Sequence, residues 1–106
     1  MEDDEEIKGL LKVLIGVTAR VAFPEEKLRQ IVAPMSSSGK YVEAYNLCDG
    51  TRSQAEIARE AGIDKGNLSK AVNRWLVQGV VFSVGSSSEP RLIHVYPLMP
   101  NLSPKP

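Results

Sequence analysis

The chain has 106 residues, 42% of them hydrophobic, and its 13 basic residues balance 13 acidic residues to give a net charge of zero. This length and composition are typical of one small folded domain and exclude an intrinsically disordered chain. Zero net charge also counts against binding nucleic acid through overall charge alone. The charge is unevenly distributed, however. Residues 2–6 are all acidic, and residues 7–106 carry 13 basic against 8 acidic residues, a net charge of +5. We interpret the acidic start as a solvated terminus, with mimicry of DNA charge as the alternative.

Few residues have the chemistry of catalysis or metal binding. The single cysteine, Cys48, cannot form an intramolecular disulfide, which favours a cytoplasmic protein and a small core residue over a redox-sensing thiol. His94 is the only histidine, and the sequence has no zinc-ligand cluster and no phosphate-binding glycine loop. We therefore expect no enzyme activity, no cofactor and no metal site. The apolar run at residues 13–17 is too short for a membrane span and follows acids rather than a basic region.

Residues 4–22 predict a first helix with apolar residues over more than half of its circumference. Such a helix should be covered on two sides, one by its own domain and the other by a second copy of the chain. We therefore predict a homodimer. Its interface is expected to include Ile7, Leu10, Leu11, Leu14, Val17 and Val21.

The next segments predict three short helices. The first runs from Pro24 to Pro34, a polar connector covers residues 35–39, and the second helix covers residues 40–48. Residues 53–56 read Ser-Gln-Ala-Glu, a capping box that opens a helix ending at Ala61, and Gly62 breaks it. Residues 1–35 are thus predicted to form a helical extension, 36–98 the main domain and 99–106 a proline-rich tail.

Residues 65–78 predict a helix with two different faces. Asp64 is a good N-cap, and Gly79 can adopt the left-handed conformation that closes a helix. One side is apolar and collects Leu68, Ala71, Val72, Trp75 and Leu76, with Trp75 expected in the core. The other side collects Asn67, Lys70, Asn73 and Arg74 and has no acid. Amide and cationic side chains are the types that bond to base edges and phosphates, whereas the alternative is an ordinary solvated face.

The pattern then changes to strands. Residues 80–84 and 92–96 are rich in β-formers and flank residues 85–90, which suit a hairpin tip. His94 on the second strand is expected to be solvated or hydrogen-bonded, with a pH switch as the alternative.

The sequence resembles the winged helix-turn-helix transcription regulators, the broad group that includes the MarR-like and ArsR-like repressors. The matching residues are LCDGTRSQAEIA at 47–58, AGI at 61–63, NLSK at 67–70, WL at 75–76 and GVVF at 79–82, followed by the hairpin. The resemblance covers about residues 40–96. It implies a mainly α fold with a small β-hairpin, a winged helix-turn-helix preceded by the two-helix extension, in a cytoplasmic regulator of transcription.

The resemblance also implies the residues that would bind double-stranded DNA. The helix 65–78 would lie in the major groove, its early residues would reach base edges, and the start of the preceding helix would bind phosphate. The hairpin tip would contact the neighbouring groove. The expected contacts are Thr51, Arg52, Ser53, Gln54, Lys65, Asn67, Ser69, Lys70, Asn73, Arg74, Ser87 and Arg91. Winged helices also serve as protein–protein interaction modules that bind no DNA, and this alternative stays open. An RNA or single-strand role is a third, which the lack of evident exposed aromatic residues disfavours.

Overall fold

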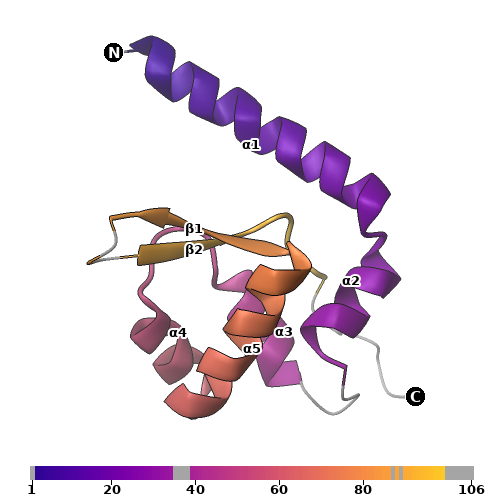
Figure 1. Cartoon of the computed structure of the whole chain (residues 1–106), viewed down its shortest axis with the longest axis vertical. Helices are drawn as coiled ribbons and strands as arrows, with labels where there is room; N and C mark the ends of the chain where they lie inside the picture. The colour runs from indigo at the N-terminus through magenta and orange to yellow at the C-terminus, as the bar shows by residue number, and fades with distance from the viewer. Residues whose placement is uncertain (1, 35–38, 87, 89, 100–106) are drawn as a thin grey trace.

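Helices dominate the structure, and a single two-stranded hairpin accompanies them. The structure is a computed structural model and describes residues 2–34, 39–86, 88 and 90–99. In chain order the elements are α1 (Glu2–Ala22), α2 (Glu25–Val32), α3 (Gly39–Asn46), α4 (Gln54–Ala61), α5 (Lys65–Gln78), β1 (Val81–Gly85) and β2 (Pro90–His94). In Figure 1 the hairpin lies between α1 on one side and α3, α4 and α5 on the other. The prediction of a mainly helical fold with a small antiparallel hairpin is confirmed.

Local capping determines where α4 begins and ends. The Ser53 hydroxyl accepts a hydrogen bond from the backbone N–H of Glu56 at 3.1 Å, and the Glu56 carboxylate accepts one from the Ser53 N–H at 2.8 Å. This reciprocal pair is the predicted capping box, which satisfies two of the free N–H groups of the first turn. Gly62 ends the helix in the left-handed region at φ 72°. A three-residue turn then leads directly into α5.

The ends of α5 also follow the prediction. The Asp64 carboxylate accepts hydrogen bonds from the N–H groups of Gly66 and Asn67 at 3.0 and 3.2 Å. Gly79 closes the helix at φ 81°. By contrast, α3 ends at Asn46, two residues before the predicted end, and Cys48 follows in a tight turn but is fully buried.

The hairpin has one face in the core and one face toward α1. Phe82 pairs with Ile93 and Ser83 pairs with Leu92, so these pairs point to opposite faces of the sheet. Leu92 is buried against the helices, whereas Phe82 and Ile93 are half-buried on the outer face. The second strand lies two residues earlier than the predicted 92–96, because Pro90 pairs with Gly85.

The hydrophobic core includes α2 and the segment after β2. Leu28 and Val32 of α2 are fully buried in the same core as Trp75, whose indole N–H donates to the Val32 carbonyl at 3.3 Å. Leu98 is also buried, and the Asn46 side chain exchanges hydrogen bonds of 2.7 and 2.8 Å with its backbone. Residues 25–32, which belong to the predicted extension 1–35, thus pack in the same core as the predicted main domain 36–98, and the division into these segments stays a prediction. The connector 35–38 and most of the proline-rich tail, residues 100–106, lie outside the described residues.

The helix α1 is only partly covered. Gly16 and Ala19 are buried and Ile15 is half-buried, so the domain covers a narrow strip of small and branched residues. The remaining apolar side chains are 51–80% exposed, and they are Ile7, Leu10, Leu11, Val13, Leu14, Val17 and Val21. The domain thus covers one side of α1, as expected, but that side holds small residues and most of the large apolar side chains stay exposed in the single chain. All six predicted interface residues are exposed, and the homodimer stays a prediction.

Two contacts of Tyr96 hold the C-terminal end of α1 on the domain. Its hydroxyl donates to the Phe23 carbonyl just after the helix. The Arg20 guanidinium lies over its ring, 4.5 Å from the ring centroid. The N-terminal half of α1 therefore projects from the domain, as Figure 1 shows.

Candidate nucleic-acid interface

The exposed side of α5 is the most distinctive polar surface among the described residues. The helix has no acidic residue between Lys65 and Gln78. Leu68, Ala71, Val72 and Trp75 are buried on its inner side. Ser69, a predicted contact residue, is half-buried. The other predicted contact residues of the helix are exposed on its outer side, and these are Lys65, Asn67, Lys70, Asn73 and Arg74. Two apolar residues depart from this division. Leu76, expected on the apolar side, is 38% exposed, and Val77 is 83% exposed beside the polar residues.

The rotation of α5 is fixed by its aromatic anchor. The Trp75 ring packs edge-on against the Tyr45 ring at 5.6 Å between centroids. The Tyr45 hydroxyl donates to the Tyr96 carbonyl at 2.8 Å and lies 3.3 Å from the Val80 carbonyl. Burial raises the pKa of Tyr45 well above its usual value, so the hydroxyl stays protonated and donates. The inner side of α5 therefore packs against α3, which is hydrogen-bonded to the residues just before and after the hairpin. This packing determines which side of α5 faces outward.

A groove of about 240 Å³ runs along the outer side of α5 toward α2 and α3. Asn67, Lys70 and Arg74 line it together with Pro34 and the half-buried Tyr41. The structure thus brings three predicted contact residues together beside an aromatic ring. Tyr41 reaches this groove from α3, and its exposed edge depends on how α2 and α3 meet.

Lys65, the first residue of α5, lies beside the start of α4. It shares a small groove with Gln54 and Ala55. Two predicted contact residues from different helices are therefore close together at the turn between them.

The start of α4 differs electrostatically from what the sequence suggested. The Arg52 guanidinium binds two carboxylates, Asp49 at 3.0 Å and Glu60 at 3.1 Å. The Asp49 carboxylate also accepts from the N–H and hydroxyl of Thr51. Arg52 and Thr51, both predicted to meet phosphate, are thus already engaged with acids.

The capping box adds a further negative charge at the same place. Because the Ser53 N–H binds the Glu56 carboxylate, the pKa of Glu56 is held below its usual value, chiefly by that hydrogen bond and with help from Arg91 and Arg59. This helix start therefore carries its own anion, which reduces its attraction for phosphate.

The hairpin and α4 enclose a wider groove of about 580 Å³. Arg91 and Ser88 line it from the hairpin side, and Gln54 and Arg59 line it from α4. Arg59 was not among the predicted contact residues, because the sequence does not reveal that the hairpin folds beside α4. Ser87, predicted at the hairpin tip, lies outside the described residues.

The cysteine and the histidine, the remaining residues with reactive side chains, are buried or half-buried and have structural roles. Burial raises the pKa of the Cys48 thiol to about 12, so the thiolate that reacts or binds metal is scarce. His94 is half-buried with Nδ1 3.2 Å from the Tyr45 carbonyl, and burial lowers its pKa, so the expectation of a hydrogen-bonded histidine is confirmed. No cluster of three or more His, Cys, Asp and Glu side chains suited to a metal ion occurs within the described ranges.

Comparison of the chain with protein-family models, curated proteins and solved structures found no match. None of the helices in the described part of the chain is both long and apolar enough to cross a membrane.

Proposed function

We propose that this protein is a dimeric winged-helix regulator of transcription that binds double-stranded DNA in a sequence-specific way. The observation that carries the proposal is the outer side of α5, where exposed amide and cationic side chains occur without an acid. The short turn between α4 and α5 and the hairpin directly after α5 support the helix-turn-helix and wing that the sequence resemblance implies.

The proposed binding mode places the N-terminal half of α5 in the major groove. Asn67 suits adenine through its paired donor and acceptor, and Lys70 suits the two acceptors of guanine. Arg74 lies one turn further on, where it can reach a phosphate. The groove beside these residues leaves room for Tyr41 to contact the same strand.

The hairpin and the start of α4 contribute less in this mode. Arg91 is the basic residue of the described hairpin, and Glu56 faces it across the wider groove. We therefore expect modest affinity, with most of the phosphate contacts made by α5.

The exposed apolar side of α1 supports the dimer. Pairing two α1 helices would remove that surface from water and bring two copies of α5 under one twofold axis. A dimer of this kind reads two half-sites, which in such regulators lie about one helical turn apart or a multiple of it.

Selection from a random duplex library at low salt tests the proposal, because it reports binding and the preferred site together. A palindromic product is expected. Binding of that product should weaken steeply with salt, and Arg74→Gln should reduce the slope of log K against log salt by about 1. Lys70→Gln should instead relax the preference for guanine at one position of the site, by about 1–3 kcal/mol. Lys27→Gln on α2 is the matched control, since it removes an exposed charge that lines neither of the grooves beside α5 and should leave the slope unchanged. If no duplex is bound by micromolar protein at low salt, the DNA function is wrong.

A second candidate is a protein–protein interaction module with no direct DNA binding. The specific observation that favours it is Val77, which is 83% exposed beside the polar residues of α5 and would gain from an apolar partner. Val77→Ser separates the two candidates, because it should leave duplex affinity unchanged under the first and weaken a protein complex under the second.

A further inference from the structure

A cleft of about 380 Å³ opens between α1 and the outer face of the hairpin. The helix approaches the segment after β2 closely at Gly16, where an added Cβ would lie 3.6 Å from the Val95 carbonyl oxygen. The volume is within the range of small-molecule sites, about 300–1,000 Å³.

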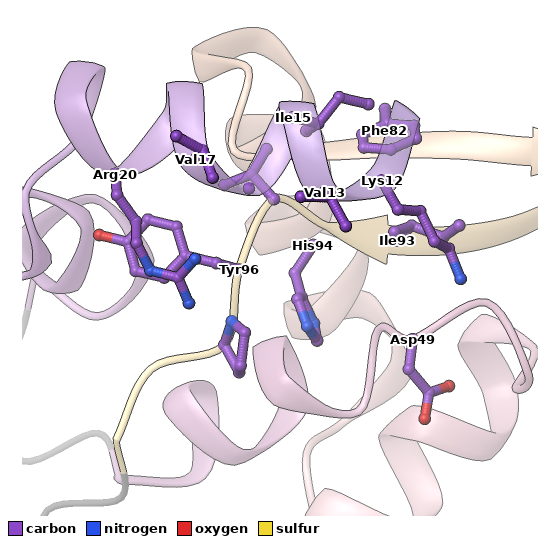
Figure 2. Close-up of a pocket in the computed structure, with 13 residues that line it drawn as sticks. Lys12, Val13, Ile15, Val17, Arg20, Asp49, Phe82, Ile93, His94 and Tyr96 are labelled. Atoms are coloured by element: carbon purple, nitrogen blue, oxygen red, sulfur yellow. The ribbon is translucent and has the colours of Figure 1, made fainter. Parts of the chain in front are cut away.

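The walls of the cleft are largely apolar. Val13 and Val17 line it from α1, and Phe82, Ile93 and Pro97 line it from the hairpin and the segment that follows. Figure 2 shows Val13 and Val17 on α1 and Phe82 and Ile93 beside it on the hairpin. They are exposed or half-buried, so an apolar ligand would remove surface that the chain itself leaves in contact with water.

Two cationic residues of α1 also line the cleft. Arg20 lies over the Tyr96 ring at one end, as Figure 2 shows, and Lys12 lies two turns away toward the other. Neither has a hydrogen bond or an ion pair with any residue in the described part of the chain. The ring contact orients the guanidinium and leaves its N–H donors at the edge available to a carboxylate.

The other polar groups of the cleft offset little of this positive charge. The Asp49 carboxylate lies at the edge of the cleft, but Arg52 binds it at 3.0 Å and Thr51 donates to it. His94 adds little positive charge at neutral pH, because burial lowers its pKa below the usual value. The cleft therefore combines apolar walls with a net positive charge.

We propose that this cleft binds a small monocarboxylate with an extended apolar chain, with the carboxylate on Arg20 and the chain along Val17 and Val13 toward Lys12. The distance between Lys12 and Arg20 along the helix axis is about 12 Å, which favours a linear ligand over a compact one. The site goes beyond DNA binding and does not depend on it, since none of the predicted DNA contacts lines the cleft.

Titration calorimetry of the full chain with sodium octanoate, below its micelle concentration, tests the proposal. We expect one octanoate per chain, and about fourfold weaker binding for each methylene removed in the series from octanoate to butanoate. Octanamide, which keeps the chain and lacks the charge, should bind at least about tenfold more weakly.

Substitutions locate the site. Arg20→Gln should weaken octanoate binding at least about tenfold, because it removes a charged hydrogen-bond partner. Lys70→Gln on α5 is the control and should leave octanoate affinity unchanged. Val17→Trp should fill the cleft and abolish binding, and the 57% exposure of Val17 leaves the fold free to accept the larger ring. The melting temperature of each variant without octanoate shows that the fold is retained.

The titration is made at protein concentrations at which the chain is monomeric, because Val17 also lies in the predicted dimer interface. Two results would overturn the proposal. They are equal octanoate affinity for Arg20→Gln and the unchanged protein, and uptake of several octanoates per chain. A protein that shifts no duplex but binds octanoate as described would disprove the DNA function and leave this site standing.

Discussion

Replacing Leu14 by alanine tests whether the exposed side of α1 is an interface between two copies. Leu14 is 60% exposed and lies in the middle of the apolar residues of α1. Alanine removes most of the apolar side chain and favours helix more than leucine does, so the helix itself should not suffer.

The expected effect follows from the exposed fraction. Fully burying a leucine side chain contributes about 1.5–3 kcal/mol, so covering the exposed 60% of Leu14 contributes about 1–2 kcal/mol in each copy. Both copies carry the substitution, which makes the loss about 2–4 kcal/mol per dimer. At 1.4 kcal/mol per factor of ten, the dimer dissociation constant should rise roughly 30- to 700-fold.

Sedimentation equilibrium over a range of protein concentrations measures this constant directly. Val77→Ala is the matched control, because Val77 is equally apolar, 83% exposed and on a different helix. The dimer dissociation constant of the Val77→Ala variant should equal that of the unchanged protein. A chain that remains monomeric at tens of micromolar, or a Leu14→Ala variant that dimerises as tightly as the unchanged protein, would refute the reasoning.

Three further predictions concern stability. Tyr45→Phe removes the hydroxyl from two buried carbonyls and should lower the free energy of unfolding by about 1–3 kcal/mol, seen as a lower melting temperature, whereas Tyr41→Phe should change it little. Because burial lowers the pKa of His94, the unfolded chain takes up its proton first, so the free energy of unfolding should fall as pH drops below the ordinary pKa of 6.5. Denaturant titrations between about pH 7 and pH 5 should show this slope, and His94→Gln should reduce it. Gly62→Ala should cost about 1–2 kcal/mol because of the left-handed φ of 72°, whereas Gly9→Ala, in open space on α1, should be neutral or stabilising in thermal unfolding.

Short-range chemistry explains why the ends of α4 and α5 could be predicted. Ser53, Gly62, Asp64 and Gly79 each act on backbone groups within a few residues of themselves, and the structure has all four in the predicted roles. The same holds for Trp75, because the spacing of apolar residues along one helix is enough to indicate its inner side.

The covering of α1 could not be predicted in the same way. The apolar residues around its circumference indicate that other protein surface should cover the helix, but they do not indicate on which side the domain lies. The buried side is instead the one with Gly16 and Ala19, because small residues permit the close approach to the segment after β2. The direction of a helix relative to its domain depends on the turn at Phe23 and Pro24, which no periodicity encodes.

Long-range pairing also limited the prediction of the candidate site. Arg52 has the appearance of a free cation in the sequence, yet Glu60 reaches it from the far end of α4. Arg59 and Tyr41 become neighbours of the site only when the hairpin and α3 are in place. In each case the partner is determined by tertiary packing rather than by local sequence.

The attachment of α1 has a consequence for engineering and for evolution. Because residues 4–14 of α1 are all exposed, they can be exchanged without disturbing the core or the orientation of α5. A chimera carrying a coiled-coil heptad sequence in place of residues 4–14 should fold as before and acquire the oligomeric state of the graft. The sequence of the projecting half of α1 can therefore change how the chain associates, while the position of α5 in the domain stays the same.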